Sequence, residues 1–198
     1  MKLSILIATI TERKKQFDSL VMFLMLQHQF NADGKSADVE LLTICDNKEM
    51  TIGAKRQRLI EQAKGEYIVF IDDDDTVAPD YIPQTLAAIE YNPDAIGFLI
   101  DCDIEGAQKK AIASIKYPEW RDNVDGYDYV RSIYHKTPVR RDLALRAGFN
   151  VSMRFGEDHD YAMRLKRYLV SEYFINQTMY YYRYHKNGQT HNQRYGIK

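Results

Sequence analysis

The sequence lacks the features that mark several classes of protein. It contains only 2 cysteines among 198 residues, too few for a disulfide-rich scaffold or a cysteine-based zinc site. Its longest apolar stretch, residues 20–26, is too short to cross a bilayer. The formal net charge of -1 gives no overall attraction to nucleic acid or to an anionic membrane. The first expected strand begins at Leu3, which leaves no room for a signal peptide, and we expect a cytoplasmic protein.

What is present is an ordinary globular composition, with 45% hydrophobic and 28% charged residues. Tyrosine is frequent, with 15 copies, and we expect most of them in the core. Cys45 and Cys102 lie in expected strands, which predicts two buried free thiols.

The hydrophobic pattern of the first hundred residues predicts strands alternating with helices. Apolar runs rich in β-branched residues occupy 3–9, 39–45 and 67–71, and helical spacing occurs over 17–28 and 52–63. This order is typical of an α/β domain with a parallel sheet. For the remainder we expect a helix over 80–91, a hairpin of 95–102 with 109–115, a loop over 117–128, helices over 138–147 and 157–169, and a strand over 173–184.

Four consecutive aspartates, Asp72 to Asp75, directly follow the third expected strand. Open parallel sheets bind ligands at the carboxyl ends of their strands. Two carboxylates about 4 Å apart repel by roughly 4 kcal/mol at an effective dielectric of 20, and a hard divalent cation relieves that repulsion. The alternative is a solvated acidic turn, but the position after a buried strand favours a metal site. An EF-hand is disfavoured because its central glycine and distal glutamate are missing.

Two further motifs have both a functional and a structural interpretation. Lys55 and Arg56 oppose the dipole at the start of the second helix, so they indicate either a bound anion, such as a diphosphate, or a solvated basic face. Glu157 and Asp158 open a later helix, where acids are a usual capping choice. A carboxylate there could also act as a general base on an acceptor hydroxyl.

Together these segments resemble family-2 glycosyltransferases of the GT-A fold. The resemblance rests on Ser4–Thr9 with Thr11 and Arg13, Asp46-Asn47, Gly53–Gln57, Ala63–Asp75 and Gly156–Asp160 followed by Arg164, in that order. It implies an α/β, Rossmann-like, mixed but mostly parallel central sheet flanked by helices. It also implies a single domain over 1–198, with a nucleotide-sugar-binding half (1–100) and an acceptor-binding half (101–198).

The resemblance also implies roles for particular residues. The nucleotide-sugar donor would be bound by Thr9, Thr11, Arg13, Asp46, Lys55, Arg56, Asp72 and Asp73, with Asp46 on the base, commonly uracil. Asp74, with Asp72, would hold Mn²⁺ or Mg²⁺, the register within the aspartate run being open. His185, after the last strand, is a further metal candidate, and His191 a weaker one. Asp158 would be the catalytic base, with Glu157 as second candidate.

The implied activity is inverting, metal-dependent transfer of a sugar from a nucleotide-diphosphate sugar, with UDP expected as the nucleotide, to the hydroxyl of an unknown acceptor. One alternative is a noncatalytic nucleotide-sugar or metal-binding module. Another is a nucleotidyltransferase, which is disfavoured because residues 9–13 contain no glycine for a phosphate loop.

The second half offers weaker candidates. His135, Arg140 or Arg141 could touch an acceptor or a phosphate, or could belong to a basic loop before a helix. Trp120 could stack on a sugar ring or serve as a buried anchor.

Overall fold

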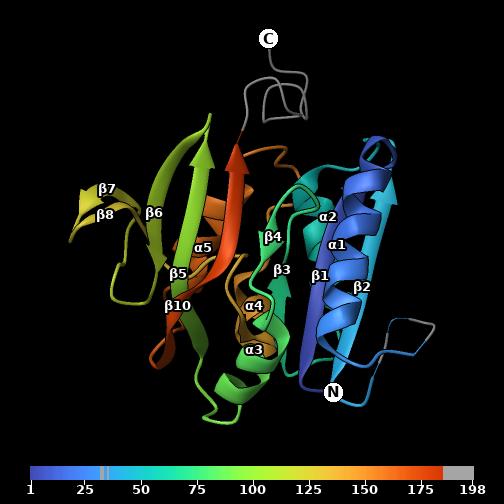
Figure 1. The fold of residues 1–198 in the computed structure, drawn as a ribbon, viewed down its shortest axis with the longest axis horizontal. Helices are drawn as coiled ribbons and strands as arrows, with labels where there is room; N and C mark the ends of the chain where they lie inside the picture. The colour runs from blue at the N-terminus through green and yellow to red at the C-terminus, as the bar shows by residue number, and fades with distance from the viewer. Residues whose placement is uncertain (32–33, 35, 185–198) are drawn as a thin grey trace.

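The computed structural model describes residues 1–31, 34 and 36–184, which form a mixed ten-stranded sheet between two layers of helices (Figure 1). Helices α1 (Lys14–Gln27) and α3 (Tyr81–Ile89) cover one face. Helices α2 (Ile52–Gln62), α4 (Arg141–Ala147) and α5 (Glu157–Leu165) cover the other. The mixed α/β architecture expected from the sequence is confirmed. Among the described residues, none of the helices combines the length and the apolar character needed to cross a membrane.

The strand order is β2-β1-β3-β9-β5-β6-β8-β7, with β10 between β5 and the short β4. The strands are β1 (Leu3–Ile10), β2 (Val39–Asp46), β3 (Tyr67–Phe70), β4 (Thr76–Val77), β5 (Ala95–Ile104), β6 (Ala107–Ala113), β7 (Arg121–Val124), β8 (Tyr127–Arg131), β9 (Val139–Arg140) and β10 (Glu172–Tyr184). A 3-10 turn, η1 (Thr11–Arg13), joins β1 to α1.

Strand β1 is the centre of the parallel part of the sheet, with β2 on one side and β3 on the other. Its side chains alternate between the two layers. Ile5 and Ile7 belong to the core under α1 and α3, and Leu6 and Ala8 belong to the core under α2, α4 and α5. A strand buried on both faces requires the continuous apolar run that the sequence has at this point.

Strand β2 is less buried than the sequence suggested, because it lies at the edge of the sheet. Its burial falls after Glu40, and Cys45 is exposed. The expected buried thiol at Cys45 is therefore wrong, whereas Cys102 on β5 is buried. An edge strand has a neighbour on one side only, so an apolar run by itself does not establish burial.

The expected loop over 117–128 is also wrong, because this segment contains most of the β7–β8 hairpin. Asp125 and Gly126 connect the two strands with φ of 53° and 82°, as a type I′ turn requires. The Asp-Gly pair was the sequence signal for this hairpin. Two smaller differences are that residues 138–147 divide into β9 and α4, and that α5 ends at Leu165.

A close approach between α2 and the turn before α5 fixes the relative position of these helices. The Gly53 backbone N–H donates to the Met153 carbonyl at 3.2 Å. A Cβ at Gly53 would overlap the carbonyl oxygen of Asn150. The absence of a side chain at this one position therefore lets the 150–153 turn lie against α2 and brings the start of α5 beside Arg56.

We expect Gly53→Ala to destabilise the fold by about 2 kcal/mol, because overpacking of a tight contact outweighs the gain in helix propensity of about 1 kcal/mol. Urea unfolding of the variant and the wild type measures the difference. Arg58→Ala, on the exposed face of the same helix, is the matched control and should be nearly neutral. An increase in stability for Gly53→Ala would contradict the close approach.

Candidate active site

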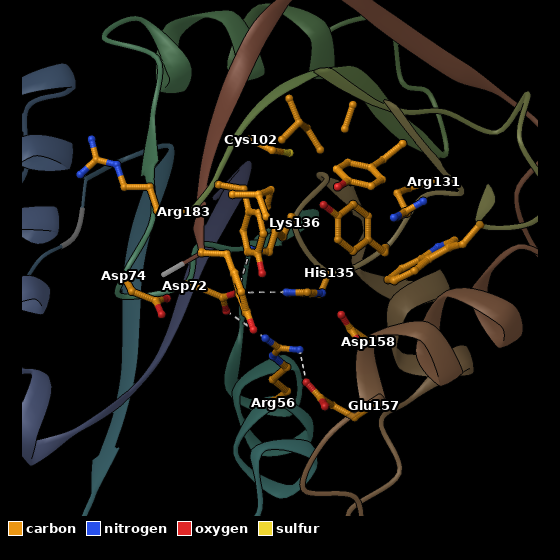
Figure 2. A pocket seen from close by; sticks show the side chains of 18 residues that line it. Arg56, Asp72, Asp74, Cys102, Arg131, His135, Lys136, Glu157, Asp158 and Arg183 are labelled. Carbon is orange, nitrogen blue, oxygen red and sulfur yellow. Dashed lines mark hydrogen bonds and ion pairs between the residues drawn. The ribbon is translucent and has the colours of Figure 1, made fainter. Parts of the chain in front are cut away.

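A pocket of about 290 Å³ lies between the end of β3, the strands β5 and β10, and the start of α5 (Figure 2). Asp72 and Asp74 lie on one side of it, and Asp158 lies on the other. The rest of its ionisable lining is Arg56, Arg131, His135, Lys136, Glu157 and Arg183. Its apolar and aromatic lining is Ile100, Cys102, Ile104, Ala111, Trp120, Tyr129, Tyr134, Tyr182 and Tyr184.

A second, smaller hollow of about 30 Å³ lies beside the end of β1 and the start of α2. It is lined by Thr9, Lys55 and Asp73, together with Ala8, Ile10, Lys48, Met50, Ile52 and Arg154. Asp73 thus faces this hollow, whereas its neighbours Asp72 and Asp74 face the larger pocket. The aspartate run therefore lies between two spaces, and each is lined by at least one carboxylate and by basic side chains.

Asp73 bonds to one residue at the end of β1 and to one in η1. Arg13 Nη1 lies 2.6 Å from one carboxylate oxygen, and Thr9 Oγ1 donates to the other at 2.7 Å. Arg13 also pairs with Asp74 at 2.8 Å. The structure thus brings Thr9 and Arg13 to the acidic run, and both side chains are buried where they bond to Asp73.

Asp72 lies among three basic side chains. Arg56 Nη2 is 2.9 Å from Oδ1, and Lys136 Nζ and His135 Nε2 are 3.0 and 3.5 Å from Oδ2. Burial by itself would raise the pKa of Asp72, but Lys136, Arg56 and His135 hold that pKa well below its usual value. Asp72 is therefore ionised at neutral pH.

Asp75 is directed into the protein. Its Oδ2 accepts from the Tyr180 hydroxyl at 2.8 Å and pairs with Lys136, and its Oδ1 accepts from the Arg183 backbone N–H at 3.0 Å. Burial, opposed by Lys136, raises the pKa of Asp75 to about 6. Its role in these contacts is to join the acidic turn to β10.

The residues present fit a hard divalent ion. Carboxylate oxygens of Asp72, Asp74 and Asp75 lie within 4.8 Å of one another, and oxygen ligands suit Mg²⁺ or Mn²⁺. Asp74 is the most accessible of the three, with 34% of its side chain exposed against 13% for Asp72. His185 and His191 lie outside the described residues.

Carboxylate crowding in this turn does not by itself require a metal ion, because the fold supplies cations to it. Each aspartate of the run contacts at least one basic side chain from another element: Arg13 from η1, Arg56 from α2, or Lys136 from the segment before β9. The sequence shows the neighbouring carboxylates, but it does not show the basic side chains that the fold brings to them from distant segments.

The start of α2 does not require a bound anion either. Lys55 pairs with Asp46 and donates to the Thr9 carbonyl at 2.8 Å, while Arg56 pairs with Asp72 and Glu157. Both cations are buried, so the alternative of a solvated basic face is wrong. Protein carboxylates therefore pair with both cations.

Asp46 organises the turn after β2. Its carboxylate accepts from the backbone N–H groups of Lys48 at 3.1 Å and Met50 at 2.7 Å. Although burial opposes ionisation, these bonds and the pair with Lys55 lower the pKa of Asp46. Thr11 is exposed nearby and donates to the Asp46 carbonyl at 3.5 Å.

The two acids at the start of α5 differ in their surroundings. Glu157 is buried and pairs with Arg56 at 2.5 Å, and burial raises its pKa. Asp158 is half-buried at the pocket, with Oδ1 accepting from the His159 backbone N–H at 2.8 Å. Burial disfavours its charge, but His135 and Arg56 favour it, and the pKa of Asp158 is lowered. Both residues line the pocket, and Asp158 is the more exposed of the two.

The β7–β8 hairpin supplies a wall of the pocket that the sequence interpretation missed. Trp120 lies edge-on to Tyr134 with ring centroids 5.4 Å apart, and its Nε1 donates to Ser132 Oγ at 3.2 Å. It is therefore both anchored and part of the lining. The Arg131 guanidinium lies 5.1 Å from the Trp120 ring and 4.9 Å from that of Tyr129.

The basic segment 135–141 divides between two locations. His135 and Lys136 line the pocket, although Lys136 was not among the sequence candidates. Arg140 pairs with Asp142 at 3.0 Å, and Arg141 donates to the Glu61 carbonyl at 3.5 Å, so the expectation of a site role for these two arginines is not supported.

His135 makes the folded state sensitive to acid. Burial and the nearby Arg56 lower its pKa from 6.5 to about 4. Between these values the unfolded chain binds a proton that the folded chain does not, so stability falls as the pH is lowered. Relative to His135→Gln, we expect the wild type to lose about 2 kcal/mol of unfolding free energy between pH 7 and pH 4.5. Urea unfolding measures the free energy of unfolding of both proteins across this range. If the two free energies change in parallel with pH, the lowered pKa of His135 is contradicted.

Comparison with known proteins identifies the chain more closely. The sequence model described as Glycosyl transferase family 2 matches residues 39–146, more than half of the chain. A candidate glycosyltransferase of Bacillus subtilis (strain 168), EpsH, is 26% identical over 149 residues, which cover 68% of this chain and 42% of that protein.

Solved structures show the same fold. S. aureus TarS matches with a TM-score of 0.64 and 16% identity over 93% of this chain and 37% of TarS. A TarS structure of residues 1–349 in complex with UDP-GlcNAc matches with a TM-score of 0.64 and 16% identity over 94% of this chain and 60% of that one. The chain therefore spans less than two thirds of each of these relatives. The fold is that of GT-A glycosyltransferases, and the chain belongs to glycosyl transferase family 2.

Proposed function

We propose that this chain is an inverting glycosyltransferase that moves a sugar from a UDP-sugar to an acceptor hydroxyl, with Asp158 as the general base. The observation that carries the proposal is that Asp158 and the pair Asp72 and Asp74 line one pocket from opposite sides (Figure 2). TarS structures in complex with UDP and with UDP-GlcNAc support a nucleotide-sugar donor.

In this proposal the donor lies across the acidic run. Its nucleoside lies toward the smaller hollow at Thr9, Lys55 and Asp73, and its sugar lies in the larger pocket. Mn²⁺ or Mg²⁺, held by Asp74 with Asp72, would supply positive charge for the departing diphosphate. Residues 1–100 thus contribute most of the donor site, and the β7–β8 hairpin contributes the acceptor wall.

The chain's own groups account for the proton. As the acceptor oxygen bonds to the anomeric carbon, Asp158 takes the hydroxyl proton, and the bond from that carbon to the diphosphate breaks with its electron pair on the leaving oxygen. The lowered pKa of Asp158 keeps it ionised and ready to accept. Glu157 forms an ion pair with Arg56, and Arg56 forms a second ion pair with Asp72. In this proposal Glu157 is therefore a positioning residue.

We expect Asp158→Asn to reduce sugar transfer by roughly 10² to 10⁴-fold while the protein still binds UDP, because only the proton acceptor is lost. A panel of nucleotide sugars with Mn²⁺, scored by released UDP, measures transfer and hydrolysis, and thermal shift measures binding. Asp160→Asn, in the same helical turn and paired with Arg164 outside the pocket, is the matched control. Unchanged turnover in Asp158→Asn would favour the alternative of a binding module.

Asp74→Ala should abolish the rise in melting temperature that UDP and Mn²⁺ produce together, because the most accessible carboxylate of the run is removed. Asp18→Ala, an exposed acid on α1, should retain the full shift. If Asp74→Ala keeps the full rise in melting temperature, Asp74 does not hold the metal ion.

A further inference from the structure

We propose that Lys136 is a built-in cation of the acidic turn, which competes with a divalent ion for Asp72 and Asp75. This inference rests on the metal site of the proposed function but not on sugar transfer. Lys136 Nζ lies 3.0 Å from Asp72 Oδ2 and also pairs with Asp75 Oδ2. It therefore lies between two of the three carboxylates that could ligate a metal.

The lysine is held in this position from several directions. Its Nζ lies 4.8 Å from the ring centroid of Tyr180 and 4.4 Å from that of Tyr182, both on β10. The main chain around it is fixed by a bond from the Phe70 N–H to the His135 carbonyl at 2.9 Å and a turn from Thr137 N–H to the Tyr134 carbonyl at 3.1 Å. Lys136 is buried, with 6% of its side chain exposed. The ammonium group is thus part of the packed structure and not a mobile surface charge.

This position has a consequence for metal binding. A divalent ion shared by Asp72, Asp74 and Asp75 would come close to the ammonium group and be repelled by it. With Lys136 in place, the ion depends mainly on Asp74, which is more accessible although it also pairs with Arg13. It completes its coordination with water and with oxygens that the protein does not supply. The diphosphate of a nucleotide is a source of such oxygens, so metal and nucleotide should bind cooperatively, and metal alone should bind weakly.

The test is a titration of Mn²⁺ by electron paramagnetic resonance, at pH 8 and without nucleotide. Lys136→Met removes the ammonium group from Asp72 and Asp75, although Arg56 stays paired with Asp72, so we expect Mn²⁺ to bind about 10-fold more tightly than to the wild type. Unchanged or weaker binding in this variant overturns the inference. Lys136→Arg, which keeps the charge, should not tighten binding.

Two further variants distinguish the effect of the Lys136–Asp75 ion pair from a nonspecific effect of the substitution. Lys136→Met combined with Asp75→Asn removes the cation and the buried acid together, and should lose the tightening; if it binds Mn²⁺ as tightly as Lys136→Met, the role of Asp75 is wrong. Lys116→Met, whose lysine pairs with Asp125 on the surface, should behave as the wild type. If Lys136→Met does not fold alone, folding restored by Mn²⁺ supports the inference, and failure to fold with Mn²⁺ overturns it. Because no sugar donor is used, these outcomes are independent of whether the chain transfers sugar.

Discussion

Carboxylates at the end of β3 can lie side by side because basic side chains from three other elements reach them. Arg13 arrives from the turn after β1, Arg56 from α2 and Lys136 from the segment before β9. Removing one partner of a buried ion pair leaves the other charge uncompensated, which is strongly destabilising. The positions of α2, β3, β9 and β10 around this point are therefore linked to one another.

Arg56 connects the ion pairs of the acidic turn to the opposite side of the pocket. Its guanidinium contacts Asp72 on one side and Glu157 on the other, and it lies over the ring of Phe70 with 5.6 Å to the centroid. A planar, permanently charged group suits this bridging position better than lysine would. Through Arg56, the proposed base at Asp158 is placed relative to the acidic turn by two ion pairs and by the close contact at Gly53.

The pocket combines two different kinds of surface. Its ionic side is built at the end of the parallel part of the sheet, where open α/β folds commonly bind ligands. Its aromatic side is built from the extension beyond β5, where β6, β8 and β7 follow in order. Trp120 and Arg131 belong to this extension, and such a wall offers flat apolar faces beside polar groups. Variation in this wall would change the proposed acceptor surface, which is built from elements other than those of the ionic side.

The sequence by itself determined the elements whose signal is local. The apolar runs at 3–9 and 67–71, the helical spacing at 52–63 and the aspartates that follow β3 predicted the α/β fold and the ionic side of the pocket, together with the family resemblance. The Asp-Gly pair at 125–126 carried a local signal for the hairpin that the interpretation overlooked. Only the tertiary structure decided which cation pairs with which carboxylate and that β2 is an edge strand. It also decided that Lys136 lines the pocket, whereas Arg140 and Arg141 do not line it. These outcomes depend on contacts between residues far apart in the chain, and periodicity and spacing carry no information about such contacts.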